Sequence, residues 1–378
     1  MKAILMLEDG FSLQGEAVNG PFETGGEVIF TTGMTGYQEV LTDPSYSGQM
    51  ICMTWPLIGN YGANSKDMES PGIHAHALLV KECCKDPSNW RSEMSLPEFL
   101  NLNNTPCMEG LDTRALARHL RINGAMRGII STRTDSRDEL LAKVRSLPTM
   151  KGQKLTPKVA AKAPYTWKNG EMNEASLNQD GSYSWQGAGL PLVVYDYGIK
   201  WNILRHLERA GFELLCVPPT FTSDQARATG CKGVFLSNGP GDPASMETEI
   251  KTVAELCEYL PVVGICLGHQ LIGRALGART EKLKFGHHGC NHPVKDLETG
   301  KIEISSQNHG FHVVLDDHAD LEATHINLND GTLEGMRHRT KPIMSLQYHP
   351  EAAAGPRDAN HLFRRFHKLI NEASTTQK

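Results

Sequence analysis

The chain has 378 residues, more than one hydrophobic core usually organises, so two domains are expected. Its net charge of −5 comes from interspersed charges of both signs, which argues against nucleic-acid and membrane-surface partners. The nine cysteines form no C-x-x-C pair and no apolar run reaches the ~18 residues of a membrane span, so we expect a cytoplasmic protein with free thiols.

Residues 1–150 are predicted to form a β-rich α+β domain. Alternating apolar residues on both sides of Asp9–Gly10 indicate a hairpin. The capping pattern at Ser95, and Asp112 paired with a stop at Gly124, indicate helices. The predicted strands are 3–7, 11–18 and 28–32, and the predicted helices follow Ser95, run from 113 to 123 and cover 136–145.

Residues 151–190 are rich in small and polar residues with few apolar ones. We interpret this segment as an extended interdomain connection with little regular structure.

From residue 191 to the end, strand and helix patterns alternate, which predicts a second domain, 191–378, with a doubly wound, mostly parallel α/β sheet. The predicted elements include strands LVVYDY, FELLCV, GVFLS, VVGI and IMSLQY, helices NILRHLERAG and METEIKTVAELCEYL, and added antiparallel strands KIEISS, HVVL and HINLND. A final helix from Asp358 to about Glu372 carries one apolar stripe, which we interpret as core packing.

The segment PVVGICLGHQ places Cys266 between a short apolar strand and a helix, flanked by Gly264 and Gly268. This Gly-x-nucleophile-x-Gly form is typical of a strand-to-helix elbow, where glycines let the backbone turn sharply. The positive end of the helix dipole favours a thiolate there. A buried, unreactive cysteine is the alternative for this residue taken alone.

A cysteine nucleophile needs a base, and the base needs an orienting group. His349 follows the predicted strand 343–348, and Glu351 lies two residues later, so a Cys266–His349–Glu351 relay is a hypothesis. The loop SNGPGDP adds main-chain N–H groups at Gly239 and Gly241 that would suit an oxyanion hole, although an ordinary turn also explains it.

The motifs SNGPGDP, GICLGHQ and QYHPE resemble, in order and spacing, the signatures of class I glutamine amidotransferases. Within that class, KFGHHGCNHPV, SQNHGFHV, MTGYQEVLTDPSYSGQ and IGNYG resemble the small subunits of carbamoyl phosphate synthetases over essentially the whole chain.

The resemblance implies that L-glutamine is hydrolysed through a thioester on Cys266, with His349 as acid and base and Glu351 orienting it. It implies glutamine contacts at eight positions: Ser45, Gly239, Gly241, Leu267, Gln270, Asn308, Gly310 and Phe311. We expect residues 308–311 to form a loop. The ammonia would pass to a large subunit that makes carbamoyl phosphate from bicarbonate and two ATP for pyrimidine and arginine synthesis.

The same resemblance implies a heterodimer with that large subunit, which could assemble further. This chain has no nucleotide motif, so it is expected to need no cofactor, with ATP and Mg bound by the large subunit. Two other hypotheses stay open at this point: a free-standing hydrolase of γ-glutamyl compounds, and a catalytically silent scaffold that docks onto a synthetase.

Two departures from the family pattern are Cys290, where a glycine is usual, and Ala353–Ala354, where Ser-Pro is usual. Both segments are expected near the start of an ammonia route. No metal site is expected, because the resemblance and the crowding of His287, His288, Cys290 and His292 into one short glycine-rich loop argue against one.

Overall fold

The computed structural model describes residues 1–316 and 318–376. The chain divides into two compact units, which are described separately. The first comprises Met1–Gln153 with two short later segments, Leu283–Cys290 and Ala353–Gly355. The second comprises Lys154–Lys282, Asn291–Ala352 and Pro356–Lys378. Among the described helices, none has the length and apolar content needed to cross a membrane.

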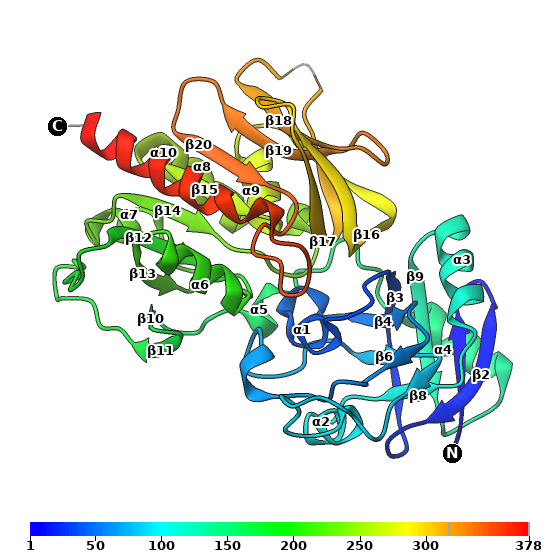
Figure 1. Cartoon of the computed structure of the whole chain (residues 1–378). Coiled ribbons are helices and arrows are strands. Elements are labelled where there is room, and N and C mark those ends of the chain that lie inside the picture. The colour runs from blue at the N-terminus through cyan, green and yellow to red at the C-terminus, as the bar shows by residue number, and fades with distance from the viewer. Residues whose placement is uncertain (317, 377–378) are drawn as a thin grey trace. The chain divides into compact units, whose positions relative to one another are not determined.

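The first unit is built on a closed barrel with the strand order β1-β2-β8-β6-β4-β3-β9 (Figure 1). The strands are β1 Lys2–Leu7, β2 Ser12–Ala17, β3 Glu23–Thr31, β4 Gln49–Met53, β6 Ala77–Leu79, β8 Cys107–Glu109 and β9 Met126–Ser131. β1 and β2 pair antiparallel, which confirms the predicted hairpin. β3, β4, β6 and β8 pair parallel in succession. A small separate sheet joins β5 (Leu57–Ile58) to β7 (Glu82–Cys83).

Three of the four helices of the first unit, α2, α3 and α4, confirm the predicted helices, whereas α1 was not predicted. They are α1 Tyr37–Thr42, α2 Leu96–Leu102, α3 Thr113–Asn123 and α4 Arg137–Ser146, with 3-10 turns at Pro44–Tyr46 and Ser65–Asp67. Ser95 and Glu98 form a reciprocal capping box at α2. Asp112 accepts the Ala115 N–H at the start of α3, and Gly124 ends that helix with a φ of 103°.

The second unit contains an 11-stranded sheet with the order β11-β10-β13-β12-β14-β15-β20-β19-β18-β16-β17. The strands are β10 Tyr165–Lys168, β11 Glu171–Glu174, β12 Leu190–Tyr195, β13 Phe212–Val217, β14 Gly233–Leu236, β15 Val262–Ile265, β16 Arg279–Asp296, β17 Ile302–Val314, β18 Leu321–Asn327, β19 Leu333–His338 and β20 Ile343–Leu346. Within β16, residues 283–290 are the part assigned to the first unit. β13, β12, β14, β15 and β20 pair parallel, and β18 and β19 continue antiparallel. The predicted doubly wound fold with added antiparallel strands is confirmed.

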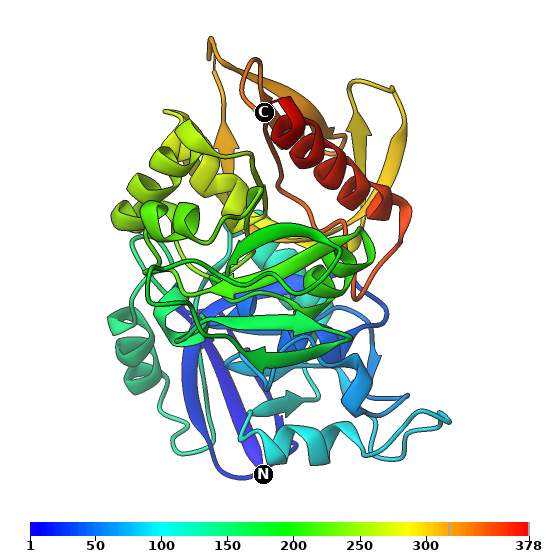
Figure 2. The same ribbon diagram turned by 90° about the vertical axis from the view of Figure 1, so that its left-hand side faces the viewer.

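Helices cover both faces of the parallel strands. They are α5 Thr156–Val159, α6 Trp201–Arg209, α7 Ser223–Ala228, α8 Glu247–Tyr259, α9 Leu267–Ala275 and α10 Leu362–Thr376, with 3-10 turns at Pro243–Ser245 and Asp358–His361. One core joins α6 and α10 to the sheet, and the other joins α7, α8 and α9 to its opposite face. Figure 2 shows the red α10 and the yellow-green α8 on opposite sides of the strands. The apolar stripe of α10 is buried in the first of these cores, as predicted.

The prediction of little regular structure in residues 151–190 is wrong. This segment contains α5 and the hairpin β10–β11, and β10 pairs antiparallel with β13 at the sheet edge. Tyr165 and Trp167 lie two residues apart on β10, so both rings point to one face and are buried in the core. The polar average composition of the segment concealed this pair, although two aromatic side chains supply enough apolar area to anchor a short strand such as β10.

Candidate active site

Cys266 lies between β15 and α9, at the carboxyl end of the parallel sheet. Its backbone has φ 55° and ψ −106°, a conformation that non-glycine residues rarely adopt. Its N–H donates to the Leu346 carbonyl at 2.8 Å, and its carbonyl accepts from the Gln270 N–H at 3.1 Å. The surrounding strands and helix therefore hold the elbow in place, as expected for a strained residue kept for function.

The glycine after the elbow serves close packing. A Cβ on Gly268 would lie 2.2 Å from the carbonyl oxygen of Leu236, so helix α9 could not approach β14 with any side chain there. The residue with positive φ is Cys266 itself. The expectation that the glycines make the turn is corrected: they provide the space, and Cys266 makes the turn.

His349 follows β20 and is fully enclosed, with 2% of its surface exposed. Its Nδ1 lies 2.7 Å from Oε1 of Glu351. Because a carboxylate only accepts, Nδ1 carries the proton and donates it. Nε2 has no protein hydrogen-bond partner among the described residues, while the nearby Cys266 acts on the ring by charge and side-chain interaction.

The charges around His349 favour its protonated form. Burial lowers the pKa of His349, but the Glu351 carboxylate and Cys266 raise it more strongly, and it reaches about 10. Burial raises the pKa of Glu351, but Lys200 and His349 outweigh it and lower that pKa to about 2. His349 is therefore expected as an imidazolium at neutral pH.

Lys200 belongs to this site, and the sequence analysis missed it. It precedes α6, and its Nζ lies 3.0 Å from Glu351 Oε1 and donates to the Ala352 carbonyl at 2.7 Å. Its side chain is 4% exposed. One signal was available: Lys200 comes shortly after the strand β12, and the carboxyl ends of parallel strands share one edge of the sheet.

The loop after β14 lies beside this cluster. Asn238 Oδ1 accepts the Lys200 main-chain N–H at 3.1 Å, which ties the loop to the start of α6. Gly241 has φ 105°, a conformation that favours glycine. Gly239 lies two residues earlier in the same turn, near Leu267 and Tyr197.

Residues 308–311 are part of strand β17, so the expectation of a loop is wrong. The Cys266 S–H donates to the Asn308 carbonyl at 3.6 Å. Gln270 Nε2 donates to the Phe311 carbonyl at 2.9 Å and to Gln347 Oε1 at 3.2 Å. The two amide protons of Gln270 are thus committed, and its Oε1 is the atom available to accept. Gly310 lies between these contacts, where a Cβ would meet no atom within 4 Å.

Ser45 belongs to the first unit. It lies in the 3-10 turn Pro44–Tyr46, and its N–H donates to Asp43 Oδ1 at 2.9 Å. Its predicted contact with glutamine stays a prediction.

The two departures from the family pattern contact each other within the first unit. Cys290 Sγ donates to the Ala354 carbonyl at 3.4 Å. The substitutions at these two segments are therefore structurally linked, which the sequence did not indicate.

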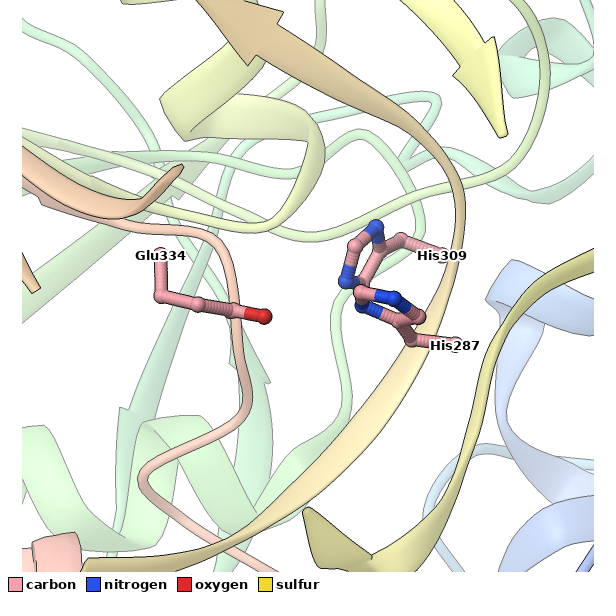
Figure 3. Close-up of side chains that lie close together, drawn as sticks. All are labelled: His287, His309 and Glu334. Atoms are coloured by element: carbon pink, nitrogen blue, oxygen red, sulfur yellow. The ribbon is translucent and has the colours of Figure 1, made fainter. Parts of the chain in front are cut away.

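Figure 3 draws three side chains with metal-binding groups: His287, His309 and Glu334. His309 and Glu334 belong to the second unit, and His287 belongs to the first. The Nδ1 of His309 lies 2.8 Å from the Phe311 carbonyl, and its Nε2 lies 2.9 Å from Gln307 Oε1. Glu334 Oε1 accepts from Asn327 Nδ2 at 2.8 Å. Because both ring nitrogens of His309 already contact oxygens, this histidine would have to break a bond to bind an ion.

A doubly wound sheet with a cysteine elbow, a histidine and a carboxylate at one edge defines a class I glutamine amidotransferase domain. The family model for "Glutamine amidotransferase class-I" matches residues 193–369. The model for "Carbamoyl-phosphate synthase small chain, CPSase domain" matches residues 5–130.

Curated relatives extend the likeness over the whole chain. Three carbamoyl phosphate synthase small chains are examples. That of Desulfovibrio desulfuricans is 69% identical over 99% of this chain and 100% of its own. That of Nitratidesulfovibrio vulgaris strain Miyazaki F is 61% identical over 99% of both. That of Aquifex aeolicus is 46% identical over 97% of this chain and 98% of its own. The chain belongs to the family of carbamoyl phosphate synthase small chains.

Proposed function

We propose that this chain hydrolyses L-glutamine to glutamate and ammonia and supplies the ammonia to a large synthetase subunit. The observation that carries the proposal is the position of His349, which is bonded through Nδ1 to Glu351 and follows β20, the parallel neighbour of the strand β15 that leads to Cys266. A cysteine, a base and an orienting carboxylate are the parts required for nucleophilic catalysis on an amide.

In the proposed reaction, the Cys266 thiolate attacks the side-chain carbonyl carbon of glutamine. His349 gives its Nε2 proton to the departing nitrogen, so the C–N bond breaks, ammonia leaves and a thioester on Cys266 remains. His349, now neutral, takes a proton from water, whose oxygen attacks the thioester. Glutamate leaves, and the thiolate and imidazolium are restored. Glu351 keeps the proton on Nδ1 throughout.

The glutamine contacts follow from the polar groups around the elbow. The main-chain N–H of Leu267 and those of Gly239 and Gly241 are proposed to stabilise the oxyanion. Gln270 can only accept through Oε1, which suits the α-ammonium group of glutamine. Asn308, Gly310 and Phe311 on β17 are proposed to contact the α-substituents, and Ser45 is proposed to complete the site.

The partner is proposed from family membership: a small chain implies a large one. The large subunit would bind ATP and Mg and use the ammonia, bicarbonate and two ATP to make carbamoyl phosphate for pyrimidine and arginine synthesis. We expect this chain to work without a cofactor or metal of its own, in a heterodimer in the cytoplasm.

The test measures ammonia release from glutamine by the purified chain, alone and with the cognate large subunit, ATP and bicarbonate. We expect a marked rise in the complex, formation of carbamoyl phosphate, and loss of glutamine-dependent activity in Cys266→Ala. A high rate that the partner leaves unchanged would indicate a free-standing hydrolase. No release in either condition, or full activity in Cys266→Ala, would refute the proposal.

A further inference from the structure

The short turn after His349 contains Glu351. A residue of helix α6 forms a hydrogen bond with the main chain of Glu351. Asn202, the second residue of α6, donates from Nδ2 to the Glu351 main-chain carbonyl at 2.6 Å. Asn202 is half-buried, whereas Glu351 is 1% exposed. The two residues are 149 positions apart in sequence, so this bond joins distant parts of the second unit.

This turn needs external support. Ala352 has φ 56°, which is unfavourable for alanine, and its N–H donates to the His349 carbonyl at 3.1 Å. The Ala352 carbonyl is held by Lys200 at 2.7 Å. The start of α6 therefore holds two consecutive main-chain carbonyls, one through Lys200 and one through Asn202.

We propose that Asn202 is a positioning residue for the hydrolysis proposed above, fixing the Glu351 main chain so that its carboxylate stays aligned with Nδ1 of His349. This inference rests on the proposed function. Asn202 differs from Lys200 in its action, because Lys200 contacts the carboxylate itself and changes its charge balance, whereas the neutral Asn202 amide contacts the main chain and acts on geometry.

The expected size of the effect follows from the distances involved. The Glu351–His349 bond is 2.7 Å long, and a misplacement of about 1 Å in a catalytic arrangement can cost about 10²-fold in rate. We expect loss of the Asn202 bond to let the turn relax and to weaken, without abolishing, the contact between the carboxylate and the imidazole.

The test replaces Asn202 in the full chain, with glutamine hydrolysis as the assay. Asn202→Leu keeps the number of side-chain heavy atoms and the branching at Cγ without the donor, and the smaller Asn202→Ser covers the case in which leucine impairs folding. We expect kcat to fall about 10- to 100-fold with little change in KM. We also expect the alkaline limb of the pH profile of kcat/KM to move to lower pH, because a displaced carboxylate raises the pKa of His349 less. Asn173→Ala, on the exposed strand β11, is the matched control and should behave as wild type.

A double-mutant cycle separates positioning from general stability. If Asn202 acts through Glu351, adding Asn202→Leu to Glu351→Gln should lower kcat by less than twofold. If the two residues act independently, the factors by which the single substitutions lower kcat should multiply. Wild-type kcat in both Asn202 variants, or losses that multiply in the cycle, would overturn the inference. A loss of thermal stability with an unmoved pH profile would also overturn it. Failure of the wild-type chain to hydrolyse glutamine both alone and with the large subunit would instead refute the proposed function.

Discussion

The Nζ of Lys200 and the Nδ1 of His349 both contact the same oxygen, Oε1 of Glu351, at 3.0 and 2.7 Å. All three side chains are at most 4% exposed. Two buried cations around one carboxylate would leave an uncompensated positive charge, which is costly. The ionisation of His349 and that of Glu351 therefore depend on each other and on Lys200.

The first prediction concerns Lys200→Met. Lys200 is the strongest influence that lowers the pKa of Glu351, so its loss should raise that pKa and move the acid limb of kcat/KM to higher pH. A lowered carboxylate pKa stabilises the fold above its usual value of 4.5, and this contribution is lost as the pH falls towards 2. At neutral pH, Lys200→Met should lose part of this stabilisation. We expect its free energy of unfolding to fall by no more than the about 3–5 kcal/mol that is typical of breaking a buried ion pair.

The measurements for Lys200→Met are urea unfolding at pH 7 and the pH profile of glutamine hydrolysis. Lys232→Met, at an exposed position of the same unit, is the control. An unshifted acid limb would show that Lys200 does not govern the ionisation of Glu351.

The second prediction concerns Glu351→Gln. The carboxylate raises the pKa of His349 to about 10, so its neutral replacement should lower that pKa and move the alkaline limb of kcat/KM to lower pH. We expect kcat to fall about 10²- to 10⁴-fold, because the imidazolium loses its partner and its orientation. The raised pKa of His349 stabilises the folded protein fully below pH 6.5, and this stabilisation is lost as the pH rises through about 10. The free energy of unfolding of Glu351→Gln should therefore depend less on pH over this range.

Steady-state kinetics from pH 5 to 10 check this second prediction, with the exposed Glu171→Gln on β11 as control. Unchanged kcat in Glu351→Gln would remove Glu351 from the proposed relay.

The third prediction concerns Gly268→Ala. The new methyl would lie 2.2 Å from the Leu236 carbonyl oxygen, so either α9 or β14 must shift. We expect a loss of stability of at least about 1–3 kcal/mol and a large fall in glutamine hydrolysis, because the elbow at Cys266 moves with α9. Thermal unfolding and kcat measure the two effects.

A matched glycine is available for the third prediction. At Gly72 a Cβ would meet its nearest atom at 3.4 Å, and its φ lies outside the positive region, so Gly72→Ala should change little. If both variants have the same stability, close packing at Gly268 is not the reason for the glycine.

The fourth prediction concerns Cys290→Gly, which introduces the glycine that the sequence resemblance leads us to expect there. The change removes the 3.4 Å contact with Ala354, and Cys290 belongs to the first unit whereas Cys266, His349 and Glu351 belong to the second. We therefore expect glutamine hydrolysis to stay within about twofold of wild type. The ratio of carbamoyl phosphate formed to glutamine consumed in the complex would report any effect on ammonia transfer. A larger loss of hydrolysis would mean that the first unit influences the proposed chemistry through this segment.

The sequence by itself determined the order of the main strands and helices from residue 191 onward and the candidate chemical groups. Periodicity in β12 to β15, capping at Ser95 and Asp112, and the elbow at Cys266 are local signals, because each depends on residues a few positions apart. The motif resemblance identified the family for the same reason, since matching spacings can be seen along one chain.

Only the tertiary structure decided which groups share the buried cluster. Lys200 and Asn202 reach the turn at Glu351 and Ala352 from about 150 positions away, and no local pattern encodes such a contact. Residues 308–311 became a strand because β17 joins the sheet edge, and Tyr165 with Trp167 formed a strand because the core covered them. Burial and long-range pairing override local composition, because the free energy of an edge strand or an ion pair depends on what packs against it.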